Sequence, residues 1–306
     1  TANVLLAMRE VLRENRPDVL LVHGDTATTF ASSLAAFYAG IKVGHIEAGL
    51  RTNNLQEPFP EEFNRQVTSK LSSWHFAPTE YSRENLLKEG VDTSSVFVTG
   101  NTVIDALFWA LKKTEVDSEM KNLIHQRLAS IVPFSLEDTR FVLITGHRRE
   151  NFGDGFLNIC EALRDLAKEY PQVQFVYPVH LNPHVQDPVT RILSGFNNVH
   201  LIAPLDYAPF LILLKHCFLV LTDSGGIQEE APSLGKPVLV MRDVTERPEA
   251  VEAGTVKLVG ANKHKIIESV SMLLDDERKY SEMSNSHNPY GDGKASIRIL
   301  DVLRKC

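Results

Sequence analysis

The chain has 306 residues, of which 43% are hydrophobic and 23% are charged, an ordinary composition for a globular protein large enough for two domains. Its formal net charge of -7 argues against a nucleic-acid-binding surface, which would show as a basic stripe. We see no run of about 18 apolar residues that could span a bilayer and no signal-peptide pattern, and we therefore expect a cytoplasmic protein. Three widely spaced cysteines are expected to be reduced thiols: Cys160, Cys217 and Cys306.

The first part of the chain, residues 1–105, alternates short apolar runs with helical patterns, an order typical of βαβ units and a parallel sheet. It opens with an amphipathic helix. Strands are expected at 19–23, 42–46, 74–77 and 96–99, and helices near 27–39, 61–72, 79–89 and 101–113. Because the chain begins with a helix and without methionine, we interpret this first domain as lacking its first strands.

A second domain is expected at residues 139–285, after a charged connecting segment at 106–138. Its strands are expected at 141–145, 173–179, 199–202, 217–222, 238–241 and 256–259, and its helices near 155–169, 184–194, 207–215, 226–234 and 262–275. This pattern predicts a complete doubly wound domain. Two such domains in series would place a ligand cleft between the carboxyl ends of their strands.

The strongest local signal is a turn of Ser224, Gly225 and Gly226 between an apolar strand and a helix. The glycines let a ligand approach the backbone, and the start of the helix presents N–H groups with partial positive charge. We therefore predict a pyrophosphate site here. Glu230 lies one turn into the helix, where its carboxylate could accept hydrogen bonds from ribose hydroxyls. The structural alternative is a simple turn with acidic residues that complement the helix dipole.

Three carboxylates lie where strands end or helices begin in the first domain. Asp25 closes the first expected strand, and its structural alternative is the N-cap of the next helix. Glu47 ends the following strand with no helix directly after it. Glu61 follows Pro60 in a first helical turn, where an i,i+4 ion pair with Arg65 is the alternative. Three carboxylates converging on one cleft would suit proton transfer better than phosphate binding.

The histidines of the second domain allow a phosphate-binding role but no metal site. His147 follows a buried strand and precedes Arg148 and Arg149, so it could hydrogen-bond a phosphate and assist its departure, or it could be an ordinary loop histidine. His180 and His184 have an i,i+4 spacing but no HExxH pattern, and we expect no metal. No GxGxxG motif is followed by an acidic residue about 20 positions later, so we expect no nicotinamide and no other cofactor.

Six motifs in family order resemble those of the non-hydrolysing UDP-N-acetylglucosamine 2-epimerases. They are HGDT at 23–26, HIEAGLR at 45–51, PEEFNR at 60–65, GHRREN at 146–151, the block at 222–247 and HNPYGDG at 287–293. The resemblance covers essentially the whole chain. It implies an α/β fold of two Rossmann-like domains with an interdomain cleft of the GT-B kind, the first domain being incomplete. It also implies that the tail at 286–306 crosses back to the first domain.

The resemblance assigns roles to matching positions of this chain. It implies that the catalytic residues are Asp25, Glu47, Glu61 and His147. It implies that the substrate-binding residues are Arg65, Phe210, Ser224, Gly225, Gly226 and Glu230. Arg148 and His180 match a second substrate site that activates bacterial members. The family resemblance further implies a homodimer, with UDP-N-acetylglucosamine, UDP-N-acetylmannosamine and UDP as ligands, that supplies N-acetylmannosamine for cell-surface polysaccharide.

The implied reaction inverts C2 of UDP-N-acetylglucosamine. Because the C2 hydrogen is not α to a carbonyl and no nicotinamide is expected, the C1–O bond to UDP would break first. This gives 2-acetamidoglucal, to which UDP adds back with protonation on the other face. Three alternatives stay open: a hydrolysing epimerase that releases free N-acetylmannosamine, a glycosyltransferase of the same architecture that needs one base, and a non-catalytic interaction module.

Overall fold

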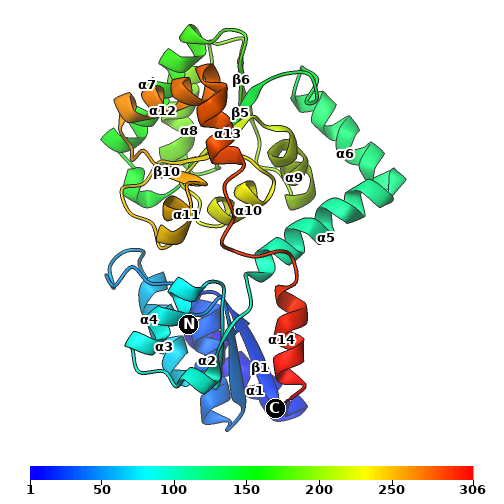
Figure 1. Ribbon diagram of the computed structural model, residues 1–306, viewed down its shortest axis with the longest axis vertical. Helices are drawn as coiled ribbons and strands as arrows, with labels where there is room; N and C mark the ends of the chain where they lie inside the picture. The colour runs from blue at the N-terminus through cyan, green and yellow to red at the C-terminus, as the bar shows by residue number, and fades with distance from the viewer. Residues whose placement is uncertain (306) are drawn as a thin grey trace. The chain divides into compact units, whose positions relative to one another are not determined.

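The computed structural model describes residues 1–305, which form two α/β units, each built on a parallel sheet (Figure 1). Unit 1 comprises Thr1–Ala106 together with the described residues from Pro289 onward, and unit 2 comprises Leu107–Asn288. The predicted α/β class with two parallel-sheet domains is therefore confirmed. Among the described residues, no helix has the length and apolar character that crossing a bilayer requires.

Unit 1 contains a four-stranded sheet in the order β1-β2-β3-β4, with every neighbouring pair parallel. The strands are β1 (Val19–His23), β2 (Lys42–Ile46), β3 (Trp74–Ala77) and β4 (Val96–Val98). The helices are α1 (Ala2–Asn15), α2 (Ala27–Tyr38), α3 (Glu61–Leu71), α4 (Glu80–Lys88), the start of α5 (Thr102–Val116) and α14 (Ala295–Leu303), with a 3-10 turn η1 (Thr93–Ser95). All four expected strands are confirmed, the last one residue shorter. Their carboxyl ends share one edge of the sheet.

Small residues let α2 pack closely on this sheet. Thr26 caps the helix by accepting a hydrogen bond from the Thr29 backbone N–H. Ala35 and Ala36 are buried in a cluster with Leu12 of α1 and Val43 of β2. Because alanine side chains are short, the helix backbone can lie near the strands, which fixes the loops at both ends of β1.

Unit 2 contains a six-stranded parallel sheet in the order β10-β9-β8-β5-β6-β7. The strands are β5 (Phe141–Thr145), β6 (Gln174–Pro178), β7 (Val199–Ile202), β8 (Leu219–Thr222), β9 (Val238–Val240) and β10 (Val256–Leu258). From the β7 edge this is the doubly wound order 3-2-1-4-5-6 of dinucleotide-binding domains. The strand order reverses between β5 and β8, and in such sheets ligands bind at the carboxyl ends of these two strands.

The helices of unit 2 cover this sheet. Besides the end of α5 they are α6 (Ser118–Ile131), α7 (Asp154–Glu169), α8 (Pro183–Leu193), α9 (Tyr207–His216), α10 (Ile227–Ser233), α11 (Pro248–Glu252), α12 (Lys263–Asp275) and α13 (Glu277–Ser284), with a 3-10 turn η2 (Arg149–Asn151). The segment at 106–138, expected as a connection, is mostly helical. Asp117 separates α5 from α6 and caps α6 by accepting from the Met120 backbone N–H at 2.9 Å. Sequence analysis identified no helix at α6, α11 or α13.

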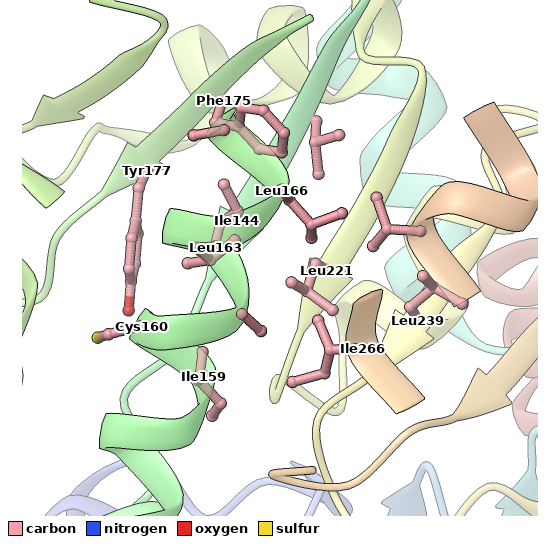
Figure 2. Close-up of a cluster of buried hydrophobic side chains, with 14 of the residues drawn as sticks. Ile144, Ile159, Cys160, Leu163, Leu166, Phe175, Tyr177, Leu221, Leu239 and Ile266 are labelled. Carbon is pink, nitrogen blue, oxygen red and sulfur yellow. The ribbon is translucent and has the colours of Figure 1, made fainter. Parts of the chain in front are cut away.

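The core of unit 2 lies between the sheet and α7 (Figure 2). Ile159, Leu163 and Leu166 recur at helical spacing and are buried in one cluster with Ile144 of β5 and Leu221 of β8. This packing anchors the two strands whose carboxyl ends form the switch point. The helix and the strands therefore hold the loops after β5 and β8 on a rigid base.

Two of the three cysteines belong to unit 2 and are buried free thiols. Burial raises the pKa of Cys160 and of Cys217 to about 12, so both thiols stay protonated and unreactive at neutral pH. Cys306 lies outside the described residues. The expectation of reduced thiols is confirmed for the two that the structure describes.

The chain returns to unit 1 after Asn288, where its last helix is tied to the start of α5. The Asn101 backbone N–H donates to the Tyr290 carbonyl at 2.8 Å. The Asp105 carboxylate accepts from the backbone N–H groups of Ala295 and Ser296 at 3.0 and 2.8 Å. Asp105 thus satisfies two of the N–H groups that the first turn of α14 leaves unpaired.

Candidate functional site

Asp25 follows β1 at the carboxyl edge of the unit 1 sheet. Its side chain forms an ion pair with Arg65 of α3, with 3.0 Å between Oδ2 and Nη2. The Asn64 side chain donates to the Asp25 carbonyl at 2.9 Å. The N-cap alternative for Asp25 is wrong, because Thr26 caps α2. The Asp25 carboxylate is 28% exposed, which leaves it accessible to a ligand although it is paired.

Glu47 follows β2, the strand next to β1, and has an unusual backbone conformation. Its φ of 66° lies in the left-handed region, which a non-glycine residue adopts at a cost and which is found disproportionately at functional sites. Its Oε1 accepts from the Asn101 side chain at 3.1 Å, and its Oε2 lies 4.0 Å from His23 Nε2. The position of Glu47 at a strand end predicts a functional carboxylate but does not predict this backbone strain.

Gly24 lies between these two carboxylates and leaves room for them. Its φ is +68°, and a Cβ placed on it would lie 3.0 Å from Glu47 Oε2. The buried His45 side chain donates from Nε2 to the Gly24 carbonyl at 2.8 Å. Burial lowers the pKa of His45 to about 3, so this histidine is neutral at physiological pH and acts as a fixed donor. His45 therefore holds the Gly24 backbone, a function that its sequence position alone did not indicate.

Arg65 does not form the i,i+4 ion pair with Glu61 that was the structural alternative. Arg65 pairs instead with Asp25 and with Glu62, the second with 3.5 Å between Nε and Oε2. Glu61 is the first residue of α3 and is partly exposed. The catalytic role of Glu61 stays a prediction.

Glu62 is a wholly buried carboxylate that sequence analysis passed over. It accepts from the backbone N–H groups of Thr52 and Asn53 at 3.0 and 3.1 Å and from the Gln66 side chain at 2.8 Å. Asn53 has a positive φ of 61°, so these hydrogen bonds hold a strained turn. Of the two adjacent glutamates, Glu62 is thus structural and Glu61 is the one left accessible.

At the switch point of unit 2, a buried carboxylate joins the loops after β5 and β8. Asp223 follows β8 and is wholly buried. Its Oδ2 accepts from the backbone N–H groups of His147 and Arg148, both at 2.8 Å. The Tyr177 hydroxyl donates to the Gly146 carbonyl at 3.1 Å. These contacts fix the start of the GHRREN loop against the strand that precedes the glycine turn.

The His147 ring lies between Asp223 and His180. Its Nδ1 is 3.6 Å from Asp223 Oδ1, and its ring stacks on His180 with centroids 5.3 Å apart and planes at 16°. Partial burial lowers the pKa of His147, the charge of Asp223 acts in the opposite direction, and Arg148 and His180 lower it further. The structure therefore brings His147 together with both residues of the predicted activating site, Arg148 and His180.

A buried ion pair lies next to the glycine turn at 224–226. A Cβ placed on Gly225 would lie 2.7 Å from Arg247 Nη1 and 3.0 Å from Glu246 Oε1. Any other residue at position 225 would have to displace these groups, so the turn requires glycine there. Ser224 and Gly226 are partly exposed, whereas Gly225 is buried. The turn can therefore offer its backbone to a ligand at 224 and 226, and the pyrophosphate site stays a prediction.

Arg247 belongs to a network of ion pairs next to this turn. It donates to Glu229 and to Glu246, the second at 2.6 Å. Arg242 donates to the same Glu246 at 3.0 Å and to Glu150 at 2.6 Å. The network links α10, the segment after β9 and the turn η2. Sequence analysis did not identify it; the only local signal is the alternation of charges in RDVTER at 242–247, directly after a buried strand.

Glu230 is buried on α10 and paired with α9. Its Oε1 accepts from the Tyr207 hydroxyl at 2.6 Å. Burial raises the pKa of Glu230, and the Tyr207 hydrogen bond partly opposes that rise. Phe210 lies one helical turn after Tyr207 and is partly exposed. The ribose role of Glu230 and the substrate-binding role of Phe210 stay predictions.

Comparisons with known proteins cover both units. A family model described as UDP-N-acetylglucosamine 2-epimerase matches residues 1–304. The chain is 58% identical over 304 residues to the UDP-N-acetylglucosamine 2-epimerase of Escherichia coli K12, which covers 99% of this chain and 80% of that protein. Solved structures are similar as well. The UDP-GlcNAc 2-epimerase of Neisseria meningitidis bound to UDP-GlcNAc has a TM-score of 0.94 and 54% identity, over 100% of this chain and 81% of that one. The Methanocaldococcus jannaschii enzyme in complex with UDP-GlcNAc and UDP has a TM-score of 0.84 and 37% identity, over 100% and 80%.

Proposed function

The chain belongs to the UDP-N-acetylglucosamine 2-epimerase family, and from this membership we propose that it interconverts UDP-N-acetylglucosamine and UDP-N-acetylmannosamine by eliminating UDP and adding it back. It is thus an isomerase. Relatives of known structure were crystallised with UDP-GlcNAc and with UDP, which supports the same ligands for this chain. The glycosyltransferase and interaction-module alternatives lose their support, because the family model and the named relatives are all epimerases.

The observation that carries the mechanism is the pair of carboxylates at neighbouring strand ends of unit 1. Asp25 and Glu47 follow β1 and β2, and the Glu47 carboxylate lies beside the Gly24 backbone. Epimerisation at C2 requires one group that removes the C2 hydrogen and a second that returns a proton on the opposite face. Two accessible carboxylates that are separately held, one by Arg65 and one by Asn101, meet this requirement. A glycosyltransferase of the same architecture would need only one base.

The residues at the unit 2 switch point bind the leaving group. We assign the pyrophosphate to the turn at 224–226, the ribose to Glu230, the base to the side of Phe210, and the departing phosphate to His147. No redox step is needed, because departure of UDP makes C1 electron-poor and so acidifies the C2 hydrogen.

The first prediction concerns the C2 hydrogen. When the enzyme is incubated with UDP-N-acetylglucosamine in heavy water, we expect one deuterium at C2 of the UDP-N-acetylmannosamine formed, with no added NAD. The reason is that the proton returned to the glucal comes from a carboxylate that exchanges with solvent. Proton NMR of the product measures the label. Product without deuterium, or turnover that requires NAD, would refute the elimination mechanism.

The second prediction concerns UDP binding by Glu230. We expect Glu230→Ala to weaken UDP binding by about 1–3 kcal/mol, or roughly 5- to 150-fold, because a ribose acceptor is lost. Tyr207→Phe keeps the carboxylate but removes a hydrogen bond that lowers its pKa. The pKa of Glu230 then rises further, so UDP affinity should begin to fall at a higher pH than in the unmodified enzyme. Calorimetric titration between pH 5 and 8 measures both effects, and equal affinity of Glu230→Ala and the unmodified enzyme would disprove the ribose assignment.

The proposal also covers the location and oligomeric state of the protein, a second substrate site and the fate of UDP. We propose a cytoplasmic homodimer that supplies N-acetylmannosamine for cell-surface polysaccharide, and a second nucleotide-sugar site that uses Arg148 and His180. The stacking of His180 on His147 supports a connection between that site and catalysis, because a ligand that moves one ring must affect the other. We favour the non-hydrolysing outcome, in which UDP is added back and no free N-acetylmannosamine is released.

A further inference from the structure

The Asp223 carboxylate uses its two oxygens differently. Oδ2 accepts both backbone hydrogen bonds from the loop after β5. Oδ1 is buried and has no hydrogen-bond partner among the described residues, yet it lies 3.6 Å from the Nδ1 of His147. An unpaired oxygen of a wholly buried carboxylate is costly, so its presence calls for an explanation. A small rotation of the His147 ring would bring Nδ1 within hydrogen-bond distance of it.

The charged and titratable groups that face His147 come from three segments. Asp223 approaches from the end of β8, Arg148 is its neighbour in the loop, and His180 follows β6 and stacks on the ring. His180 Nδ1 accepts from the Asn182 backbone N–H, which places the proton of a neutral His180 on Nε2. Of these three groups, Asp223 alone is negative. It is therefore the group that favours a protonated His147.

We propose that Asp223 is the positioning residue of His147: its Oδ1 holds the imidazole with a proton on Nδ1, and its charge stabilises the imidazolium form. The second ring nitrogen, Nε2, is then the atom that acts on the ligand. The same Asp223 carboxylate also fixes the loop after β5, because its Oδ2 accepts two backbone hydrogen bonds from that loop. Orientation of the ring and placement of the loop are thereby set by one buried group.

This inference deepens the proposed function, on which its catalytic part rests. During elimination the C1–O bond breaks, its electron pair goes to the β-phosphate oxygen of UDP, and the C2 proton goes to a carboxylate of unit 1. Neutral His147 carries its proton on Nδ1, so Nε2 first takes up a proton from solvent, and the Nε2–H of the resulting imidazolium then donates a hydrogen bond to the departing oxygen and stabilises its negative charge. During re-addition the same hydrogen bond weakens as the C1–O bond forms. No oxidant or further reactant is needed.

The direct test is nitrogen NMR of the enzyme labelled with ¹⁵N-histidine, with His147→Asn used to assign the His147 signals. In the unmodified enzyme we expect neutral His147 to carry its proton on Nδ1. In Asp223→Asn we expect the His147 pKa to fall, because the charge that raises it is gone, and the tautomer to change, because an amide N–H₂ facing Nδ1 favours an unprotonated Nδ1. Tyr177→Phe is the matched control. It removes the neighbouring hydrogen bond to Gly146 without changing the charge, and it should leave the His147 tautomer and pKa unaltered.

Kinetics separate positioning from a purely structural role. We expect Asp223→Asn to lower kcat at least about 10-fold. The double variant of Asp223→Asn and His147→Asn should be no slower than His147→Asn alone, because both substitutions remove the same function. An additive loss in the double variant would overturn the proposal. An Nε2–H tautomer of neutral His147 in the unmodified enzyme would also overturn the proposal, and this measurement does not depend on the folding of any variant. The NMR measurement requires neither UDP nor turnover. An unexpected His147 tautomer would therefore overturn the role of Asp223 and leave the proposed function intact. Product without deuterium would overturn the proposed function and leave the tautomer result unchanged.

Discussion

Glu47→Gln is expected to lower kcat by about 10²-fold or more while leaving UDP binding unchanged, and Asp25→Asn is expected to do the same. Each substitution keeps the size of the side chain but removes a group able to accept the C2 proton. Glutamine at position 47 can still accept from Asn101, and asparagine at position 25 can still accept from Arg65, so both side chains should stay in place. The measurements are the epimerisation rate and the Kd of UDP.

A surface carboxylate of the same unit provides the control. Asp92 is exposed and caps the short turn η1 through the Ser94 backbone N–H, an interaction that asparagine also makes. Asp92→Asn should therefore leave both the rate and the UDP affinity unchanged. If Glu47→Gln and Asp25→Asn retain more than about a tenth of the rate, neither carboxylate transfers the proton. If instead they lose UDP binding, their role is in binding and the assignment of roles to the two units is wrong.

The second large effect is expected on stability. Arg247→Ala should lower the free energy of unfolding of unit 2 by about 3–5 kcal/mol, because Glu229 and Glu246 lose a guanidinium partner inside the protein. All three side chains are buried, so water cannot readily replace the lost contacts. Hydrogen exchange in peptides covering 217–241, followed as a function of urea, reports the unfolding of this region without interference from unit 1.

Lys215 offers a matched control on the surface of unit 2. Its ion pair with Glu115 is as short, at 2.6 Å, but both side chains are largely in contact with solvent. Lys215→Ala should cost at most about 1 kcal/mol. Gly225→Ala should destabilise the same peptides as Arg247→Ala, because its Cβ would displace the arginine. Equal stability of the Arg247→Ala and Lys215→Ala enzymes would show that the buried network does not support the glycine turn.

The positions of the strands, and with them most candidate residues, could be predicted from the sequence. β1, β2, β3, β5 and β7 lie at the predicted residues, because short, mainly apolar runs that alternate with helical patterns are typical of strands in a parallel sheet. A residue directly after such a run must lie at the carboxyl edge of a sheet. That reasoning found Asp25, Glu47 and His147 without knowledge of the tertiary structure.

The sequence alone also established the family, because its motifs occur in order along the whole chain and the family model matches the same residues. It predicted too few helices in the second half. Few buried positions mark the helices α6 and α13, because α6 buries only Ile124 and Leu128 and α13 has no fully buried residue. Their stability comes from caps such as Asp117 and from packing, neither of which the periodicity alone reveals.

Only the tertiary structure decided which of these residues act together. Asp223 meets His147 because β8 lies beside β5, and the order of strands in a sheet is not encoded in the periodicity of any one of them. The ion pair of Arg247 with Glu229 also depends on which segments pack together. So does the difference between Glu61 and Glu62, which are both acidic and adjacent in the chain. Glu61 is partly exposed, whereas Glu62 is buried and accepts hydrogen bonds from the backbone of Thr52 and Asn53. Local sequence specifies what each segment forms, whereas long-range packing specifies which charges are neighbours, and the chemistry of the site depends on those neighbours.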